Sequence, residues 1–60
     1  MQVDDYKKLQ RKTFLHNGIF VHQGSKVRIL EINESDITVE FTDMEGFQHR
    51  LEGVQADELE

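Results

Sequence analysis

The stretch that decides the fold runs from Gly24 to Leu51 and reads GSKVRILEINESDITVEFTDMEGFQHRL. Two turn segments, at 33–36 and 43–46, divide it into three short runs in which apolar and polar residues alternate. In the middle run, one face of an extended chain carries Ile37, Val39 and Phe41. Three antiparallel strands joined by short turns are therefore predicted, and the rest of the chain has to pack against them.

The first of these runs contains a break in the alternation. Val27 and Ile29 are in phase, but the next apolar pair, Leu30 and Ile32, is on the opposite phase. One extra residue in a strand shifts every later side chain to the other face. The sequence therefore predicts a bulge or a strong bend near Ile29 and Leu30.

A β-hairpin is predicted upstream, around Asn17-Gly18. Asn-Gly between two apolar runs is the strongest short-range hairpin signal, because both residues tolerate positive φ. A two-residue loop gives the register His16–Ile19, Leu15–Phe20 and Phe14–Val21. Since both faces of this hairpin are apolar, we expect either a strand pair curled inside a small barrel or a pair whose second face is covered by the helix. Phe20 and Phe47 are then expected to be core residues.

The first dozen residues predict a short α-helix at about 3–12. Acidic residues at its start and basic residues at its end suit the helix dipole. Val3, Tyr6 and Leu9 recur every three residues and form one narrow apolar stripe. A helix of two to three turns does not persist alone, so the stripe is expected to dock on the sheet. At the other end of the chain, a short helical turn is expected to bury Leu59.

Length and composition indicate one small domain, 1–60. A chain of 60 residues buries little of its surface, and it has no cysteine that would form a disulfide or a thiolate metal site. No apolar run approaches the roughly 18 residues of a membrane span, and no signal-peptide pattern follows the first residue. We therefore expect a cytoplasmic protein.

The residues capable of site chemistry do not form a recognisable site. His16 and His22 are of a metal-ligating type, but the hairpin register turns them to opposite faces. Ser25, Asp43 and His49 are the residue types of a hydrolytic triad, without the spacing of a nucleophile elbow. No glycine-rich phosphate loop is present. We expect no catalytic residues, no metal, no cofactor and no enzymatic activity.

The uneven distribution of charge suggests a binding function. Residues 1–30 contain six basic and two acidic residues, a balance of +4, and residues 31–60 contain ten acidic residues against Arg50, a balance of −9. An acidic outer face on the three-stranded meander is expected to bind another protein with a basic surface, or the open edges of the sheet are expected to accept a partner strand. The residues of this face are Glu31, Glu40, Asp43, Glu45 and Glu52.

Several motifs carry a resemblance to a known family. Gly24-x-x-Val27-x-Ile29, Val39–Gly46 and Ala56–Leu59 occur in an order that resembles the SH3-like small barrels of bacteria, including short domains of unknown function. Gly24–Leu30 is also similar to the opening of the photosystem I accessory SH3-like subunit, which has a long loop that this chain lacks. The resemblance covers about the last 37 residues and implies a mainly β fold, an SH3-like barrel of about five antiparallel strands, which the N-terminal helix predicted from the residues precedes. It is consistent with a small bacterial or phage accessory protein.

Two other functions stay open. A short helix before five strands is also the order of Sm-like proteins, which form rings and bind RNA, although the Sm-like signature is not matched. A nucleic-acid-binding barrel of the KOW or Sm-like kind would use an anion patch made by Lys7, Lys8, Arg11, Lys12, Lys26 and Arg28, with Tyr6 or Phe20 for stacking. Self-association of the oppositely charged halves is the other alternative.

Overall fold

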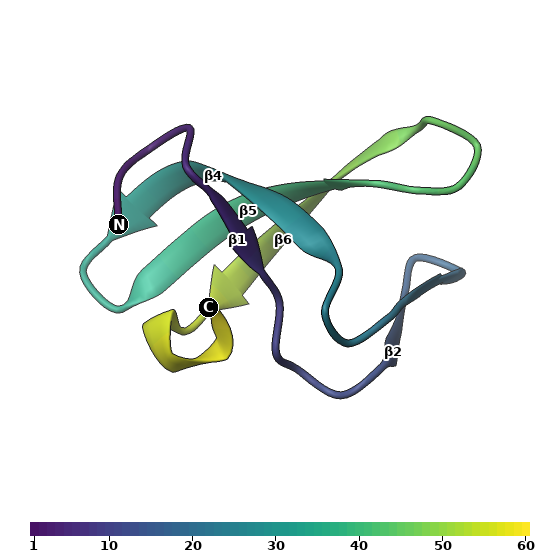
Figure 1. Cartoon of the computed structure of the whole chain (residues 1–60), viewed down its shortest axis with the longest axis horizontal. Coiled ribbons are helices and arrows are strands. Elements are labelled where there is room, and N and C mark those ends of the chain that lie inside the picture. The colour runs from purple at the N-terminus through teal and green to yellow at the C-terminus, as the bar shows by residue number, and fades with distance from the viewer.

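The computed structural model of the protein describes residues 1–60 and contains six strands and one 3-10 turn. The elements are β1 (Tyr6–Lys8), β2 (Phe14–His16), β3 (Ile19–Val21), β4 (Lys26–Asn33), β5 (Asp36–Thr42), β6 (Gln48–Val54) and η1 (Ala56–Glu58). The mainly β class expected from the alternation is thereby confirmed. The long meander of β4, β5 and β6 dominates the molecule (Figure 1).

The strands form two antiparallel sheets that do not close into a barrel. One sheet has the order β1-β4-β5-β6, and the other contains only β2 and β3. The outer strands of the larger sheet are linked indirectly, because the chain after η1 returns to β1 and forms a bridge between Leu9 and Leu59. In this bridge region the Lys8 N–H donates to the Glu60 carbonyl at 3.1 Å, and the Glu60 N–H donates to the Lys8 carbonyl at 2.9 Å. The expectation of a five-stranded SH3-like barrel was wrong.

The expected α-helix at 3–12 was also wrong, because this segment forms an edge strand. Tyr6, Lys7 and Lys8 pair with residues 26–28 of β4, and Asp4 has a φ of 73°, which is not helical. Of the apolar stripe, Val3 and Tyr6 are exposed and only Leu9 is buried. Pairing with β4 provides backbone hydrogen-bond partners that a two-turn helix cannot secure in water, so tertiary context overrides the local pattern.

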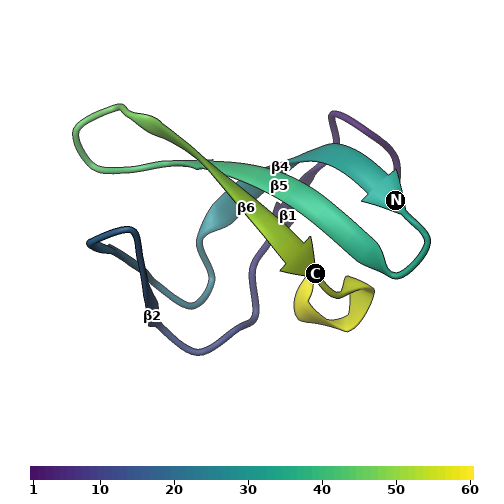
Figure 2. The ribbon, with the colours of Figure 1, turned by 180° about the vertical axis from the view of Figure 1, so that it is seen from behind.

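The predicted break in the alternation of β4 is confirmed. The register between β4 and β5 shifts between Ile29 and Glu31, which leaves Leu30 as the extra residue of a bulge. A second shift lies between Ile37 and Val39 in the pairing of β5 with β6, near Gly53 with its φ of 72°. Bulges increase the local twist of a strand. In the view from behind, β6 passes in front of β5 at an angle, as a strongly twisted meander does (Figure 2).

The predicted hairpin at Asn17-Gly18 is confirmed with its register. Phe14 pairs with Val21, Leu15 with Phe20 and His16 with Ile19. The two loop residues have φ values of 51° and 80°, as a two-residue turn that matches the strand twist requires. This hairpin extends from one end of the larger sheet (Figure 1). Only one of its faces packs against the core, through Phe14, Ile19 and Val21.

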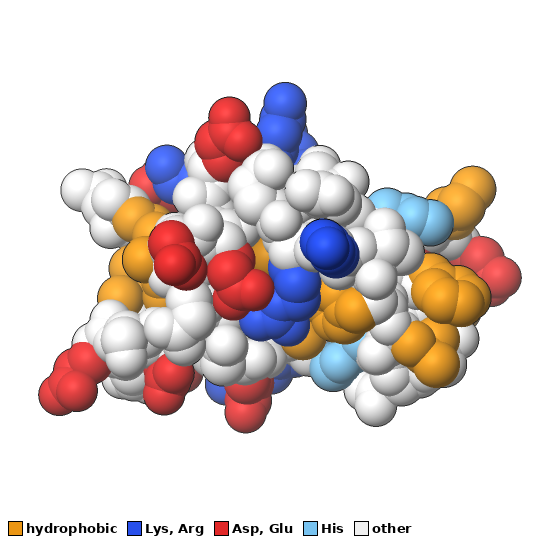
Figure 3. Space-filling view, turned by 90° about the horizontal axis from the view of Figure 1, so that it is seen from below, with side chains coloured by type: hydrophobic (Ala, Val, Ile, Leu, Met, Phe, Trp, Pro, Cys, Tyr) orange, Lys and Arg blue, Asp and Glu red, His pale blue; other side chains and the backbone are white.

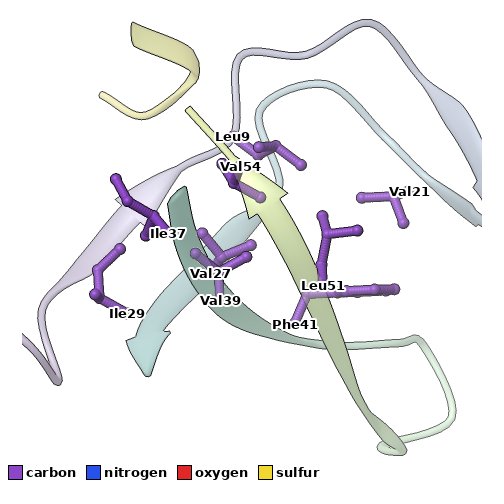
Figure 4. Close-up of a cluster of buried hydrophobic side chains, with 9 residues drawn as sticks. All are labelled: Leu9, Val21, Val27, Ile29, Ile37, Val39, Phe41, Leu51 and Val54. Carbon is purple, nitrogen blue, oxygen red and sulfur yellow. The ribbon is translucent and has the colours of Figure 1, made fainter. Parts of the chain in front are cut away.

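The core lies between the concave side of the meander and the segments that cross it (Figure 4). Seven of its nine residues come from β4, β5 and β6, and the others are one residue before the hairpin and one within it. The nine are Leu9, Val21, Val27, Ile29, Ile37, Val39, Phe41, Leu51 and Val54. Leu59 packs against this cluster from the C-terminal turn, as expected.

Candidate functional site

A groove opens at the end of the molecule where the hairpin β2–β3 and the turn between β5 and β6 project in the same direction (Figures 1 and 2). Its volume is about 570 Å³. We call it the end groove. Its lining residues are Gly18, Ile19, Phe20, His22, Ser25, Phe41, Thr42, Asp43, Met44, Glu45, Phe47 and His49. Hydrophobic and histidine side chains gather at this end of the surface (Figure 3).

Large apolar side chains stand exposed around the end groove. Phe20 is 65% exposed, Phe47 is 63% exposed and Met44 is fully exposed. The expectation that a helix covers Phe20 and Phe47 was wrong, because no helix exists and nothing else packs on the outer face of the hairpin. The sequence signal for this exposure is the position of Met44 and Phe47 in a tight turn, where a side chain has no facing strand.

One wall of the groove is a stacked pair of rings. The Phe41 and His49 rings lie 5.0 Å apart between centroids at an interplanar angle of 27°. Phe41 is buried in the core, while His49 lies half-buried above it and faces the groove. These residues are cross-strand partners in β5 and β6, so the stacking follows from the register of the meander.

Asp43 organises the turn between β5 and β6. Its Oδ1 accepts hydrogen bonds from the backbone N–H groups of Glu45 and Phe47, each at 2.9 Å, and its Oδ2 lies 2.8 Å from His49 Nε2. The hydrogen bond from His49, and then those from the two backbone groups, lower the pKa of Asp43 below its usual value. Within the chain, the Asp43 carboxylate fixes the position of Phe47, and the predicted contact of Asp43 with a partner stays a prediction.

The predicted acidic face is interleaved with arginines. The Arg28 guanidinium lies 3.5 Å from the Glu40 carboxylate, and Arg50 lies 3.7 Å from Glu31 and 3.2 Å from Glu52. Arg28 and Glu40 are cross-strand partners in β4 and β5, whereas Arg50 and Glu52 lie two residues apart in β6 and Glu31 reaches Arg50 from β4, on the far side of β5. A count of charges along the sequence does not show which acidic and basic side chains become neighbours in the folded sheet. Among the five predicted acidic residues, Glu45 makes no ion pair and lies beside the end groove.

The predicted basic patch is divided in the structure. Arg11 binds the C-terminal turn, because its Nε and Nη2 donate hydrogen bonds to the Glu58 carboxylate at 2.6 and 2.9 Å. Its guanidinium also lies 5.0 Å from the centre of the Phe14 ring. The Arg11 hydrogen bonds, with one from the Gln55 N–H, lower the pKa of Glu58 to about 2. Lys12 is exposed on the connection to the hairpin, and Lys7 is half-buried opposite Val27.

The other basic residues of the predicted patch lie together on the outer face of β1 and β4. Lys8 is the cross-strand partner of Lys26, and Arg28 is the partner of Tyr6. The Lys26 Nζ lies 4.8 Å from the centre of the Tyr6 ring. Sequence reasoning named these three basic residues but placed Lys8 on the expected helix, whereas the structure places it on β1 beside β4.

The three histidines have different surroundings, although His22 and His49 both line the end groove. His49 contacts Asp43, His16 Nε2 lies 3.2 Å from the Arg50 carbonyl oxygen, and His22 is exposed beside the end groove. No group of three or more histidine, aspartate or glutamate side chains is arranged to hold a metal ion.

Comparison of the chain with protein-family models, curated proteins and solved structures finds no match. The resemblance of its motifs to SH3-like domains stays a prediction. The structure has no helix with the length and apolar character needed to cross a membrane.

Proposed function

We propose that this chain is a small, non-enzymatic protein-interaction module that binds a short extended segment of a partner protein in the end groove. The observation that carries the proposal is the exposure of Phe20, Met44 and Phe47 around one groove. Soluble monomers rarely leave adjacent large apolar side chains in water, and such patches are typical of binding sites. A partner side chain that covers them removes this apolar surface from water.

The charge of the groove favours a basic partner segment. Asp43 and Glu45 line it, and no lysine or arginine does. A segment that combines an apolar anchor with a neighbouring lysine or arginine is complementary to this lining. The proposal therefore keeps the expected acidic contact but restricts it to the residues of the β5–β6 turn, because the acidic residues on the sheet are beside arginines.

The rigidity of the groove wall supports binding by a preformed site. Asp43 holds the backbone of the turn through two hydrogen bonds, and His49 is held between Asp43 and Phe41. A site that is already ordered loses less conformational entropy when a ligand binds. The positions of Phe47 and His49 are thus suited to recognition of one side chain, while Phe20 on the hairpin forms the opposite wall.

Selection from a random peptide library tests the proposal. The wild-type protein, a Phe20→Ser/Phe47→Ser variant and a Val3→Ser control are each immobilised. Val3 is 52% exposed but does not line the groove, so the control removes apolar surface elsewhere. The wild type and the control are expected to select peptides with an apolar residue next to lysine or arginine, and the double variant is expected to select none.

Two results would count against this function. One is that the double variant selects the same peptides as the wild type. The other is that the wild type self-associates through the groove, seen as a concentration-dependent sedimentation coefficient that the double variant lacks. In that case, the occupant is a second copy of this chain instead of a different protein.

A further inference from the structure

A separate cluster of basic residues surrounds Tyr6 on the outer face of the larger sheet. Tyr6 and Lys8 alternate along β1, and their cross-strand partners in β4 are Arg28 and Lys26. Residues two apart in a strand point to the same side, so these four side chains form one block. Their neighbours Lys7 and Val27 point to the other side, where Val27 is buried.

The basic groups in this block lack sufficient anionic partners. Lys8 and Lys26 are directly opposite each other, a placement that is destabilising for like charges. No carboxylate lies within 4.0 Å of either ammonium group. Arg28 has one carboxylate neighbour, Glu40 at 3.5 Å, and its Nε is buried without any hydrogen-bond acceptor. A bound anion would offset the repulsion between Lys8 and Lys26 and would give both ammonium groups a partner, and the Arg28 side chain, which is 39% exposed, lies beside them.

The surface around the block is hollowed on both sides of Tyr6. One hollow of about 520 Å³ lies over β4 and β5, and another of about 320 Å³ lies over β1 towards the C-terminus. Both hollows are lined by Tyr6 and Lys26. Ser25, Thr42 and Gln48 add polar groups to the first, and the carboxylates that line them are Glu40 and Glu60, one in each.

We infer that this face binds single-stranded nucleic acid, independently of the peptide function of the end groove. Lys8, Lys26 and Arg28 contact the phosphates, and Tyr6 stacks on a base. The aromatic ring is what separates this occupant from an acidic peptide. Tyr6 is 61% exposed although Lys26 lies over its ring, and exposed aromatics beside cations are the stacking platforms of single-strand binding proteins.

The overall charge sets the conditions under which binding is measurable. The net charge of −5 repels a polyanion at long range, and Glu40 and Glu60 lie close to the site. Binding is therefore expected at low ionic strength and is expected to weaken as salt rises. Three phosphate contacts predict a slope of about −2 for log K against log salt concentration, because each contact on a single strand contributes about −0.7.

Fluorescence anisotropy with a labelled ten-nucleotide oligothymidylate, from about 20 to 150 mM salt, tests the inference. Lys8→Gln and Lys26→Gln are each expected to reduce the magnitude of the salt slope by about 0.7. Tyr6→Ala is expected to weaken binding about tenfold, the effect of one lost base stack, and Tyr6→Phe is expected to bind like the wild type. Lys12→Gln is the matched control, because Lys12 is exposed and lies outside both hollows.

Three outcomes would overturn the inference. The first is no binding by the wild type near 50 mM salt. The second is an equal loss of affinity in Lys12→Gln and Lys26→Gln, which indicates diffuse attraction without a site. The third is displacement of the oligonucleotide by a polyglutamate peptide at equal charge concentration, which indicates that the face recognises acidic chains. Far-ultraviolet circular dichroism of each variant confirms that the fold is retained.

Discussion

The Arg11 guanidinium binds the Glu58 carboxylate through two hydrogen bonds of 2.6 and 2.9 Å, between residues 47 positions apart in the chain. This pair fastens η1 to the segment between β1 and β2. Glu58 also accepts a hydrogen bond from the Gln55 N–H at 2.9 Å, so one carboxylate both caps the turn and connects it to the rest of the molecule. The contact therefore holds the C-terminal turn against the segment that follows β1.

Loss of this pair is expected to destabilise the fold. Arg11→Gln or Glu58→Gln is expected to lower the free energy of unfolding by about 1–2 kcal/mol, between the values for exposed ion pairs and for hydrogen bonds to charged groups. Urea denaturation followed by circular dichroism measures the change, with Lys12→Gln as a control near zero. If both single variants and the double variant match the wild type, the pair does not hold the C-terminal turn.

Acid is expected to destabilise the protein through two carboxylates. The pKa of Glu58 in the folded chain is about 2, below its ordinary value of 4.5, and the pKa of Asp43 is also lowered. A lowered folded-state pKa means that the unfolded chain binds protons more readily, so the stabilisation is present above pH 4.5 and is lost as the pH falls towards 2. Urea denaturation at pH 7, 4.5, 3.5 and 2.5 is expected to show this decline.

The pH dependence of a variant identifies the responsible group. Glu58→Gln is expected to be less stable than the wild type at pH 7 but to lose less stability between pH 4.5 and 2.5, because its side chain does not take up a proton. The two curves therefore converge at low pH. Parallel curves would assign the acid sensitivity to other carboxylates.

Substitution of Asp43 is expected to loosen the turn that carries Phe47. Asp43→Ala removes the acceptor of both backbone N–H groups and the partner of His49. The amide resonances of Glu45 to Phe47 are expected to shift and broaden in nuclear magnetic resonance spectra, and peptide affinity is expected to fall several-fold. Glu45→Ala is the matched control, since its side chain makes no hydrogen bond or ion pair, and it is expected to leave the turn resonances sharp. Sharp, unshifted turn resonances in Asp43→Ala would contradict this role.

Core substitution at Ile29 is expected to be severe. Ile29 is fully buried beside the bulge of β4, so Ile29→Ala is expected to cost about 2–5 kcal/mol, and Ile29→Val about 0.5–1.5 kcal/mol. A chain of 60 residues has little stability to lose, so Ile29→Ala is expected to be largely unfolded at 25 °C. Ile32→Val, at a residue that is 38% exposed, is expected to remain close to the wild type by thermal denaturation. Equal effects at both positions would contradict the assigned core.

The hairpin and the bulge could be predicted from the sequence, because each depends on residues that are close together in the chain. Asn17-Gly18 determined the hairpin and its register, and the phase change at Ile29 and Leu30 located a bulge. Both features follow from side-chain period and from turn residues that accept positive φ. They needed no knowledge of distant contacts.

Features that depend on distant pairing were not predictable in this way. The apolar residues of segment 3–12 have a helix-like spacing, but the segment forms the strand β1 because its backbone pairs with β4. The acidic face and the basic patch were counted along the chain, whereas the structure pairs Glu58 with Arg11 and Glu40 with Arg28 across elements. The end groove was missed for the same reason, since the absence of the helix is what leaves Phe20 uncovered.

The affinity of one library-selected peptide for matched variants tests the proposed function most directly. By isothermal titration calorimetry, Phe47→Ser is expected to weaken binding about 10- to 30-fold, as for an aromatic anchor worth about 1.4–2 kcal/mol. Val3→Ser is expected to bind with the affinity of the wild type, with an equally negative heat-capacity change. Equal affinity of Phe47→Ser and Val3→Ser would contradict the end groove as the binding site.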